Sequence, residues 1–403
     1  MSRVVYTKNE VMQYVKEEDV KFIRLAFCDV YGKQKNISIM PDELARAFES
    51  GISIDASAVP GFGGEASSDL LLFPDPSTLC VLPWRPSHGR VVRMFCFVRY
   101  PDGRDFERDS RRILKDAVQN ALEKGYAFSF GAEIEFYLFK TDDEGNPTGI
   151  PFDTAHYMDI APLDKGENVR REICLTLERM GIRPESSHHE EGPGQNEIDF
   201  HFSDPVTAAD DALTFLWVVK TVAEKNGLYA DFSPKPIKDA PGSGMHINIS
   251  VTALREKKDL HPYAVSGIMN RISDMTAFLN PCENSYERLG KNKAPSTVTW
   301  AAQNRNELIR IPAAWDEYRR IELRSPDAML NPYLAYALII YAVTEGIERG
   351  ELPQTAVYAQ DENNNDKDVK KLPQSLAEAK QCALQSEFLR RVLPNEIIQS
   401  YSI

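Results

Sequence analysis

Four short stretches of the chain alternate strictly between apolar residues and residues with charged or metal-binding side chains. They read GAEIEFYLF (131–139), GQNEIDFHF (194–202), GSGMHINIS (242–250) and RRIELR (319–324). Because successive side chains on a strand point to opposite faces, the pattern predicts four β-strands, each with one apolar and one polar face. The polar faces offer carboxylates, an imidazole and guanidinium groups, whereas solvent-facing strands are ordinarily rich in Thr, Ser and Lys. We therefore expect a metal- and phosphate-binding site on one face of a sheet.

The composition is that of an ordinary globular protein, and it argues against a nucleic-acid-binding, membrane-spanning or secreted protein. With 403 residues, 42% hydrophobic and 27% charged, the chain is long enough for two domains. The net charge of −13 argues against a nucleic-acid partner, because phosphate backbones require a basic surface. We expect no membrane span and no secretion signal, since apolar runs of the required length are missing. The six cysteines form no C-x-x-C pair, which favours reduced thiols in a cytoplasmic protein.

The predicted elements divide the chain near residue 105. The N-terminal part, 1–105, is rich in strands, with a hairpin over 21–40, long loops over 55–89 and a strand over 90–99. The second part, 106–403, combines the four alternating strands with helices. Asp109 and Ser110 cap the first of these helices, in which Ile113, Leu114, Ala117, Val118, Ala121 and Leu122 share one face. Further helices are predicted at 165–181, 208–226, 261–278 and 331–349, and 360–371 is expected to be a solvated loop.

Acidic residues and one histidine supply ligands for two divalent cations. The candidate ligands are Glu133, Glu135, Glu190, Glu197, His246 and Glu322. Oxygen-rich sites suit Mg²⁺ or Mn²⁺, and clustered carboxylates without cations would repel one another. Several arginines accompany them, and arginine forms paired hydrogen bonds to carboxylates and phosphates. The combination indicates an acidic substrate and a nucleotide polyphosphate.

Each motif taken alone has a simpler interpretation. A polar-faced strand is usually half-exposed sheet, and a lone His246 is more often a core histidine than a ligand. RRIELR would be a solvated, salt-bridged strand, and His188-His189 an exposed polar turn. Four independent strands that all place acids, His or Arg on one face favour the functional interpretation.

At these residues the chain resembles the glutamine synthetases of the bacterial type, over nearly its whole length. The motifs include HHEEGPGQNEIDF, PGSGMHINIS, AAQNRNELIRIP and RRIELRSPDAMLNPYLAY, in the family's order and at about its spacings. The resemblance implies an α+β fold: an N-terminal β-grasp domain, 1–105, and a catalytic domain, 106–403, with a curved antiparallel sheet and surrounding helices. It also implies a cytoplasmic homo-oligomeric ring with active sites between neighbouring subunits.

The resemblance further implies roles for individual residues. One divalent ion would be held by Glu135, Glu190 and Glu197, and the other by Glu133, His246 and Glu322. The substrate-binding residues would be Glu135, Gly242, His246, Arg288, Arg305 and Arg324. The residues beside ATP would be Phe202, Asn248, Ser250, Arg305, Arg310 and Arg320. Catalysis is assigned to Asp55, contributed by the adjacent subunit, and to Lys293, Arg305 and Arg324.

The implied reaction couples glutamate to an amine at the expense of ATP. The γ-carboxylate attacks the terminal phosphorus of ATP, which gives an acyl phosphate and ADP, and a neutral amine then displaces phosphate. Ammonia is the default amine, and two or more Mg²⁺ or Mn²⁺ ions are expected to take part.

Two positions depart from the family's pattern in the part that selects the amine. The flap, RLGKNKAP (288–295), carries Lys293 where the family has a glutamate, and Pro241 replaces an asparagine. A cation at this place should repel ammonium by about 4 kcal/mol at close range in a partly dry site. A γ-glutamyl ligase for an alkylamine, polyamine or amino alcohol is therefore an alternative, and a binding or regulatory homologue without turnover is another.

Overall fold

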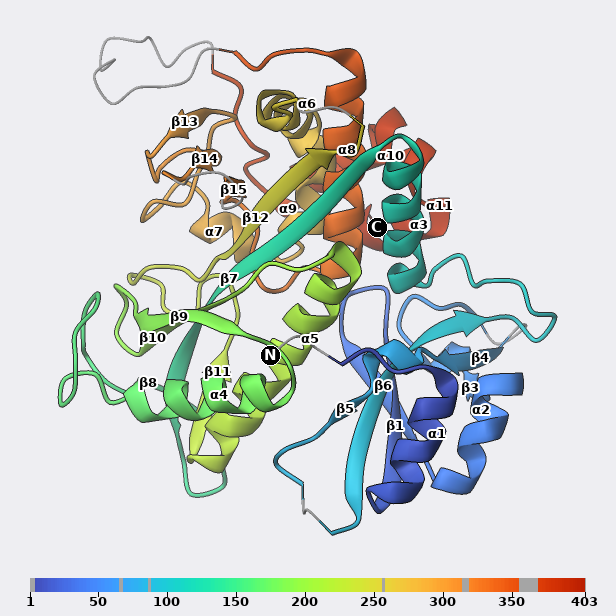
Figure 1. Cartoon of the computed structure of the whole chain (residues 1–403). Coiled ribbons are helices and arrows are strands. Elements are labelled where there is room, and N and C mark those ends of the chain that lie inside the picture. Colours follow the sequence, from blue (N-terminus) through green and yellow to red (C-terminus); the bar gives the residue numbers. More distant parts are fainter. Residues whose placement is uncertain are drawn as a thin grey trace. The chain divides into compact units, whose positions relative to one another are not determined.

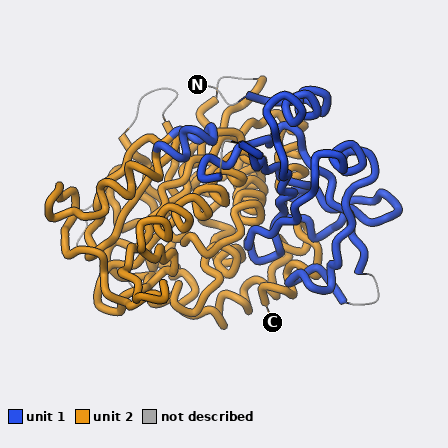
Figure 2. Tube along the Cα trace, turned by 90° about the horizontal axis from the view of Figure 1, so that it is seen from below, with its two compact units in different colours: residues 1–113, 175–183 blue, residues 114–174, 184–403 orange. Residues whose placement is uncertain are grey.

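A computed structural model describes residues 4–64, 68–85, 88–255, 258–313, 319–354 and 369–402 of the chain. The contacts within the chain divide it into two compact units (Figure 2). Unit 1 comprises residues 1–113 and 175–183, and unit 2 comprises residues 114–174 and 184–403.

Unit 1 is built on a small mixed sheet with the strand order β2-β1-β6-β4-β3, and β5 also pairs with β6. Its strands are β1 (Val20–Cys28), β2 (Gln34–Ile39), β3 (Ile52–Asp55), β4 (Asp69–Pro74), β5 (Cys80–Val81) and β6 (Arg90–Arg99). The central pair, β1 and β6, is parallel, and the other pairs are antiparallel. The helices are α1 (Lys8–Glu17) and α2 (Leu44–Ser50), with 3₁₀ turns at Pro41–Glu43, Ala56–Ala58 and Pro76–Thr78.

The predicted hairpin is present, but the long loop predicted over 55–89 is wrong in its middle. Gly32, with φ of 82°, lies in the turn between β1 and β2. Residues 69–74 form β4, between β3 and β6, and bury Leu70 and Leu72. The neighbouring Gly, Ser and Pro residues obscure this short alternation of buried and less buried side chains. The strand is stable only because it pairs with two other strands.

Unit 2 is built on a larger sheet with the order β13-β14-β15-β12-β7-β10-β9, and β8 and β11 also pair with β7. Its strands are β7 (Tyr126–Thr141), β8 (Pro147–Pro151), β9 (Pro184–His189), β10 (Gln195–Phe200), β11 (Leu228–Asp231), β12 (Met245–Ala253), β13 (Trp300–Ala302), β14 (Ile309–Ile311) and β15 (Ile321–Leu323). All described pairs are antiparallel except β13 with β14. The long strand β7 runs through the centre of this sheet, beside β12 (Figure 1).

Helices accompany this sheet, and the predicted ones lie within a few residues of their expected bounds. They are α3 (Ser110–Glu123), α4 (Glu167–Arg179), α5 (Pro205–Lys225), α6 (His261–Leu279), α7 (Ser285–Arg288), α8 (Pro332–Arg349), α9 (Leu376–Gln385), α10 (Glu387–Val392) and α11 (Asn395–Ser402). α3 begins in unit 1, and α4 is shared between the units. Leu122 of α3 is exposed, so the predicted apolar face is wrong at that residue. The solvated loop predicted for 360–371 lies mostly outside the described residues.

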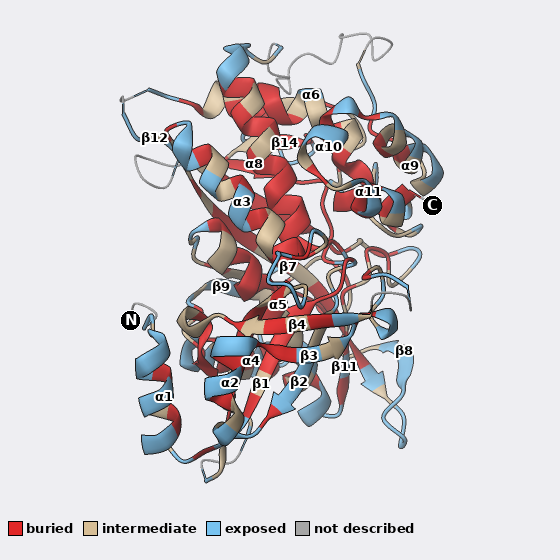
Figure 3. Ribbon diagram, turned by 90° about the vertical axis from the view of Figure 1, so that its right-hand side faces the viewer, coloured by how far each residue is buried: buried red, intermediate tan, exposed pale blue. Residues whose placement is uncertain are grey.

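The apolar run in 334–343 belongs to α8, which is a buried core helix. Asn331 caps its first turn by accepting a hydrogen bond from the Tyr333 N–H, and Gly350, with φ of 64°, ends it. Gly346 lies against Gly267 of α6 so closely that an added Cβ would be 2.6 Å from the Gly267 Cα. Most of α8 is accordingly red in Figure 3. In the described part of the chain no helix has the length and apolar character needed to cross a bilayer.

Candidate functional site

The polar faces of the four predicted strands lie side by side on the sheet of unit 2. In the strand register Glu197 is opposite Glu135, and Asp199 and His246 flank Glu133 from its two sides. On the next strands, Glu322 is opposite both Asn248 and Arg310. The apolar partners of the alternation, such as Ile134, Ile198 and Ile247, are fully buried on the other face. Strand pairing thus assembles one acidic and basic surface from residues that are far apart in the sequence.

The candidate metal ligands form overlapping groups whose ligand atoms lie within 4.8 Å of one another. One group consists of Glu133, His246 and Glu322, the second set predicted from the sequence. The other predicted set is divided between groups that share Glu197. These groups are Glu135, Glu197 and His246, and His188, Glu190 and Glu197. A further group joins Glu133 and Glu197 to Asp199.

The charges of these carboxylates make the donor set suitable for divalent cations. Burial, and then the negative charge of Asp199 and the nearby glutamates, raises the pKa of Glu197 well above its ordinary value. Burial and the charge of Glu190 likewise raise the pKa of Glu135. A divalent cation would compensate the repulsion that these acids exert on one another. Five glutamates and a histidine at this spacing fit Mg²⁺ or Mn²⁺.

Hydrogen bonds favour the ionised form of two other members of the cluster, Glu133 and Glu190. Although burial opposes ionisation, hydrogen bonds from His246 and Asn248 lower the pKa of Glu133 to about 2. Burial likewise opposes ionisation of Glu190, but hydrogen bonds from His188 and from the Glu191 N–H lower its pKa. Glu322 is completely buried and forms ion pairs with Arg310, at 2.6 Å, and with Arg324. The cluster therefore contains both carboxylates whose ionised form is stabilised by hydrogen bonds and acids whose ionisation a cation would favour.

The predicted arginines lie around this cluster, and they differ in the hydrogen bonds that their guanidinium groups form. Arg288 is buried and donates hydrogen bonds to the carbonyls of Ser325 and Arg324, at 2.8 and 3.2 Å. Arg324 donates from Nε to the Arg305 carbonyl, at 2.9 Å, and Arg320 donates to the Asn248 side chain. The Nε of Arg310 is buried and has no hydrogen-bond partner among the described residues. That unsatisfied donor is suited to an anionic ligand.

The glycines of the GSGMH stretch are required by close packing beside the cluster. A Cβ on Gly242 would be 2.4 Å from the Pro234 carbonyl oxygen, and one on Gly244 would be 2.4 Å from Nη2 of Arg288. The Gly244 N–H donates to Glu135 at 2.8 Å. The backbone here therefore approaches Arg288 and Glu135 in a way that a larger residue would prevent.

The cluster forms the floor of a cavity of about 450 Å³. Besides the metal-ligand candidates, residues such as Tyr157, Arg288, Arg305 and Arg324 line it. A second cavity of about 110 Å³ shares Glu133 and Arg320 with the first and includes Phe202, Asn248 and Ser250. Phe202 is 48% exposed and offers a ring face to a planar group. Every site residue predicted within unit 2 lines one of these two cavities except Glu322, which is completely buried and pairs with two arginines that line the first.

The rim of the larger cavity carries the departures noted in the sequence. Lys293 forms an ion pair with Glu191, and the two side chains are 51% and 38% exposed. Asn292 and Lys293 have positive φ angles, of 47° and 67°. A hydrogen bond from the Tyr137 hydroxyl fixes the Pro241 carbonyl, at 2.7 Å. The flap is thus tied to the Glu190–Gln195 turn by a pair of opposite charges.

One predicted residue lies in the other unit. Asp55 ends β3 of unit 1, is exposed, and accepts hydrogen bonds from the Ser57 N–H and hydroxyl, at 2.9 and 2.6 Å. Its role in the site of an adjacent subunit remains a prediction.

Two of the simpler interpretations are wrong. RRIELR is not a solvated strand, because all three residues of β15 are buried. His188-His189 is not an exposed turn, because it ends β9 and His189 is completely inaccessible. Both segments look polar in the sequence, but strand pairing and ion pairs within the site satisfy their polar groups.

The sequence patterns do not identify several residues of the site. Gln195 donates to Glu135 and to the Gly242 carbonyl, at 3.3 and 3.1 Å. Asp199 follows Glu197 by two positions, so the alternation that identifies Glu197 could have identified it too. His188 and Glu191 give no signal beyond their proximity to Glu190, and Tyr157 gives none.

Two family profiles match this chain and together cover most of it. Residues 19–101 match "Glutamine synthetase, beta-Grasp domain", and residues 107–403 match "Glutamine synthetase, catalytic domain". Curated relatives named glutamine synthetase are similar over nearly their full length. The protein of Methanosarcina mazei is 42% identical, over 98% of this chain and 92% of its own. Those of Clostridium saccharobutylicum and Thermus thermophilus are both 40% identical, over 98% and 97% of this chain and 93% of theirs.

Solved structures share the fold, and the expected fold class is confirmed. The structure of GmaS in complex with ADP has a TM-score of 0.88 at 28% identity, covering 97% of this chain and 94% of that one. The Plasmodium falciparum glutamine synthetase, at 22% identity, has a TM-score of 0.87 and covers 100% of this chain and 96% of its own. The α+β fold with a β-grasp domain and a catalytic domain agrees with both.

Proposed function

The chain belongs to the glutamine synthetase family, and from that premise we propose which of its residues carry out the family's reaction. It is an ATP-dependent carboxylate–amine ligase that joins glutamate and ammonia and uses ATP with Mg²⁺ or Mn²⁺. The observation that carries the residue assignment is the convergence of the four polar strand faces on one cavity.

Two divalent cations would be held by the six predicted ligands. Glu133, His246 and Glu322 would hold one ion, and Glu135, Glu190 and Glu197 the other. When bound, the cations would neutralise the charge that develops on a transferring phosphoryl group. The buried, hydrogen-bonded carboxylates keep these positions fixed before any substrate arrives.

The arginines around the cluster would bind the two anionic substrates. Arg288 and Arg324 would hold the carboxylates of glutamate, with Glu135 near its amino group. Arg305 and Arg310 would face the phosphates of ATP, and the free Nε–H of Arg310 supports this role. Phe202 and Ser250 would lie beside the nucleoside, and the ADP bound by the similar GmaS structure supports a nucleotide in this fold.

The reaction then follows in two steps. The γ-carboxylate oxygen attacks the terminal phosphorus of ATP, the bond to ADP breaks, and a γ-glutamyl phosphate forms. A neutral amine attacks the carbonyl carbon, phosphate leaves, and the nitrogen loses a proton. The cavity holds the acyl phosphate away from water, which would otherwise hydrolyse it.

The test of this proposal measures ADP formation and phosphate release with glutamate, ATP and Mn²⁺ while the amine is varied. We expect turnover with ammonia. A protein that releases no ADP with any amine would contradict the proposal, as would one that forms ADP equally well without glutamate.

A second candidate, a γ-glutamyl ligase for a larger amine, is favoured by the Lys293–Glu191 pair at the rim. A cation at the flap repels ammonium, and the pair neutralises the carboxylate of Glu191 that would attract it. Both candidates share every step up to the acyl phosphate. Turnover with an alkylamine, polyamine or amino alcohol, but none with ammonia, would establish the second candidate.

We also propose a homo-oligomeric ring in which Asp55 of one subunit completes the site of its neighbour. Asp55 is exposed, so another subunit could reach it, and two hydrogen bonds from Ser57 fix its carboxylate. Mixed oligomers of Asp55→Ala and Glu322→Ala subunits should regain about a quarter of the wild-type activity, because about one site in four then has both residues. Mixtures without any regain would contradict the shared site. A cytoplasmic location is supported by the six cysteines, which all lie in the described part of the chain and form no disulfide there.

A further inference from the structure

The turn from Glu190 to Gln195 carries two residues that face the site. Glu190 is a proposed metal ligand, and Gln195 holds Glu135 and the Gly242 carbonyl. The turn is closed by hydrogen bonds from the Glu190 N–H to the Gln195 carbonyl, at 2.8 Å, and from the Gln195 N–H to the Gly192 carbonyl, at 2.9 Å. A small shift of this turn would therefore move Glu190, a proposed metal ligand, and Gln195, which holds the proposed metal ligand Glu135.

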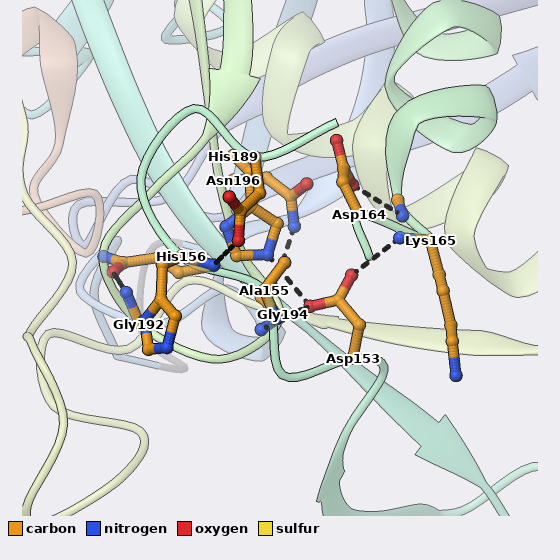
Figure 4. Close-up of polar contacts among 12 residues, drawn as sticks. Asp153, Ala155, His156, Asp164, Lys165, His189, Gly192, Gly194 and Asn196 are labelled. Carbon is orange, nitrogen blue, oxygen red and sulfur yellow. Dashed lines mark hydrogen bonds and ion pairs between the residues drawn. The ribbon is translucent and has the colours of Figure 1, made fainter. Parts of the chain in front are cut away.

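Behind the turn lies His189, whose side chain is completely buried. Its Nδ1 is 2.6 Å from the Glu190 carbonyl oxygen. Its Nε2 is 2.9 Å from Oδ1 of Asp153, and Figure 4 shows both side chains. A carbonyl oxygen only accepts hydrogen bonds, so Nδ1 carries a proton. The imidazole thus connects the backbone of Glu190 to a buried carboxylate.

Asp153 holds the other end of the same turn. Its carboxylate accepts hydrogen bonds from the Gly194 N–H, at 3.0 Å, and from the N–H groups of Ala155 and Lys165, at 3.3 and 3.0 Å. Gly194 immediately precedes Gln195. One carboxylate is therefore linked to both ends of the turn, directly at Gly194 and through His189 at Glu190.

We propose that Asp153 and His189 are positioning residues that hold the Glu190–Gln195 turn, and with it the Glu190 carboxylate, in place for the metal. The inference rests on the proposed role of Glu190 as a ligand. Glu190 and Gln195 line the cavity, whereas its described lining does not include Asp153 or His189. Asp153 and His189 therefore act on the site through the backbone of the Glu190–Gln195 turn.

The same atoms could be mistaken for a separate metal site, because Asp153, Asp164 and His189 place ligand atoms within 4.8 Å. Their hydrogen bonds argue against it. Asp164 is engaged by Arg170 at both oxygens and by the Gly166 N–H. Nδ1 of His189 is committed as a donor to the Glu190 carbonyl, and Asp153 already accepts four hydrogen bonds. A metal would have to displace most of these partners.

Two substitutions of His189 separate the two links. The side-chain NH₂ of asparagine reaches about as far as Nδ1, so His189→Asn retains a donor for the Glu190 carbonyl and loses the link to Asp153. Glutamine reaches about as far as Nε2, so His189→Gln retains the link to Asp153 and releases Glu190. Asp153→Asn places an NH₂ group against one of the donors that the carboxylate now satisfies.

The experiment measures Mn²⁺ affinity by electron paramagnetic resonance, together with thermal stability without metal and kcat and KM for Mn²⁺. We expect Asp153→Asn and His189→Gln to weaken Mn²⁺ binding about 10- to 100-fold, as loss of outer partners of metal ligands does. We expect His189→Asn to bind Mn²⁺ more tightly than His189→Gln although it is less stable, because the buried Asp153 carboxylate loses its imidazole partner. If Asp153 and His189 had only a structural role, the Mn²⁺ affinity of the variants would follow their thermal stability.

Glu345→Gln is the matched control. Glu345 forms a two-pronged ion pair between α8 and Arg271 of α6, at 3.0 and 2.7 Å, away from the described lining of the cavity. It should lower stability and leave Mn²⁺ affinity unchanged. Variants of Asp153 and His189 with wild-type Mn²⁺ affinity, or with losses that only match their stability, would overturn the inference. If Glu190→Ala itself leaves Mn²⁺ binding unchanged, the assignment of Glu190 fails instead.

Discussion

The floor and the rim of the cavity are built in different ways. The floor consists of side chains on paired strands, and its central acid, Glu322, is completely buried between Arg310 and Arg324. The rim consists of the flap and of Glu191, which are joined by the ion pair of Lys293 and Glu191. Rigid strands fix positions within fractions of an ångström, whereas exposed pairs contribute little energy. We infer from this difference that the floor performs the phosphoryl transfer that both candidate ligases share, and that the rim selects the amine.

The largest loss of activity is expected from Glu322→Ala, in the floor of the cavity. The change removes a proposed metal ligand and leaves Arg310 and Arg324 without their carboxylate. We expect ADP formation to fall by about 10³-fold or more, with every amine. The assay is ADP release, with circular dichroism to verify folding. A folded variant that retains activity would refute the assignment of the floor.

A smaller effect is expected from Gly242→Ala, at the edge of the floor. The new Cβ would be 2.4 Å from the Pro234 carbonyl and 2.8 Å from Cγ of Arg288, so Arg288 must move. We expect about a 10- to 100-fold loss in kcat/KM for glutamate and a loss of about 1–3 kcal/mol in stability. Gly64→Ala is the control, because its Cβ would meet nothing within 4 Å. Equal behaviour of the two variants would show that the close approach at Gly242 is unimportant.

The rim is tested by a series at Lys293. Lys293→Met removes the positive charge, and Lys293→Glu reverses it and also repels Glu191. We expect kcat/KM for ammonia to rise from wild type to Met to Glu, by about tenfold in total, because the repulsion of ammonium is removed and then becomes attraction. The KM for ATP should not change. An unchanged preference for ammonia across the series would place the choice of amine elsewhere.

The smallest effect is expected from Glu191→Gln. An exposed ion pair contributes at most about 1 kcal/mol, so the melting temperature should hardly change. The rate of ADP formation at saturating amine should stay near the wild-type rate, while the KM for the amine shifts. A large loss of ADP formation would mean that Glu191 belongs functionally to the floor.

The sequence predicts the floor well and the rim poorly, for a physical reason. Alternation on a strand has a fixed period, so the sequence alone assigns Glu133, Glu197 and His246 to polar faces. Loops have no such period. The strand at 69–74 resembles a loop in sequence, but its pairing with β3 and β6 buries its apolar residues. The histidines before Glu190 resemble an exposed turn, but they pair with β10, and His189 also contacts the distant Asp153.

By itself the sequence determined which side chains share a face of each strand, where the five longest helices lie, and, through its motifs, the family. Only the tertiary structure decided which strands are neighbours, and therefore that Glu322 lies between two arginines and that Asp153 holds the turn of Glu190. Local patterns follow from the geometry of a single segment. The register between segments far apart in the chain depends on the packing of the whole sheet, which no local pattern contains.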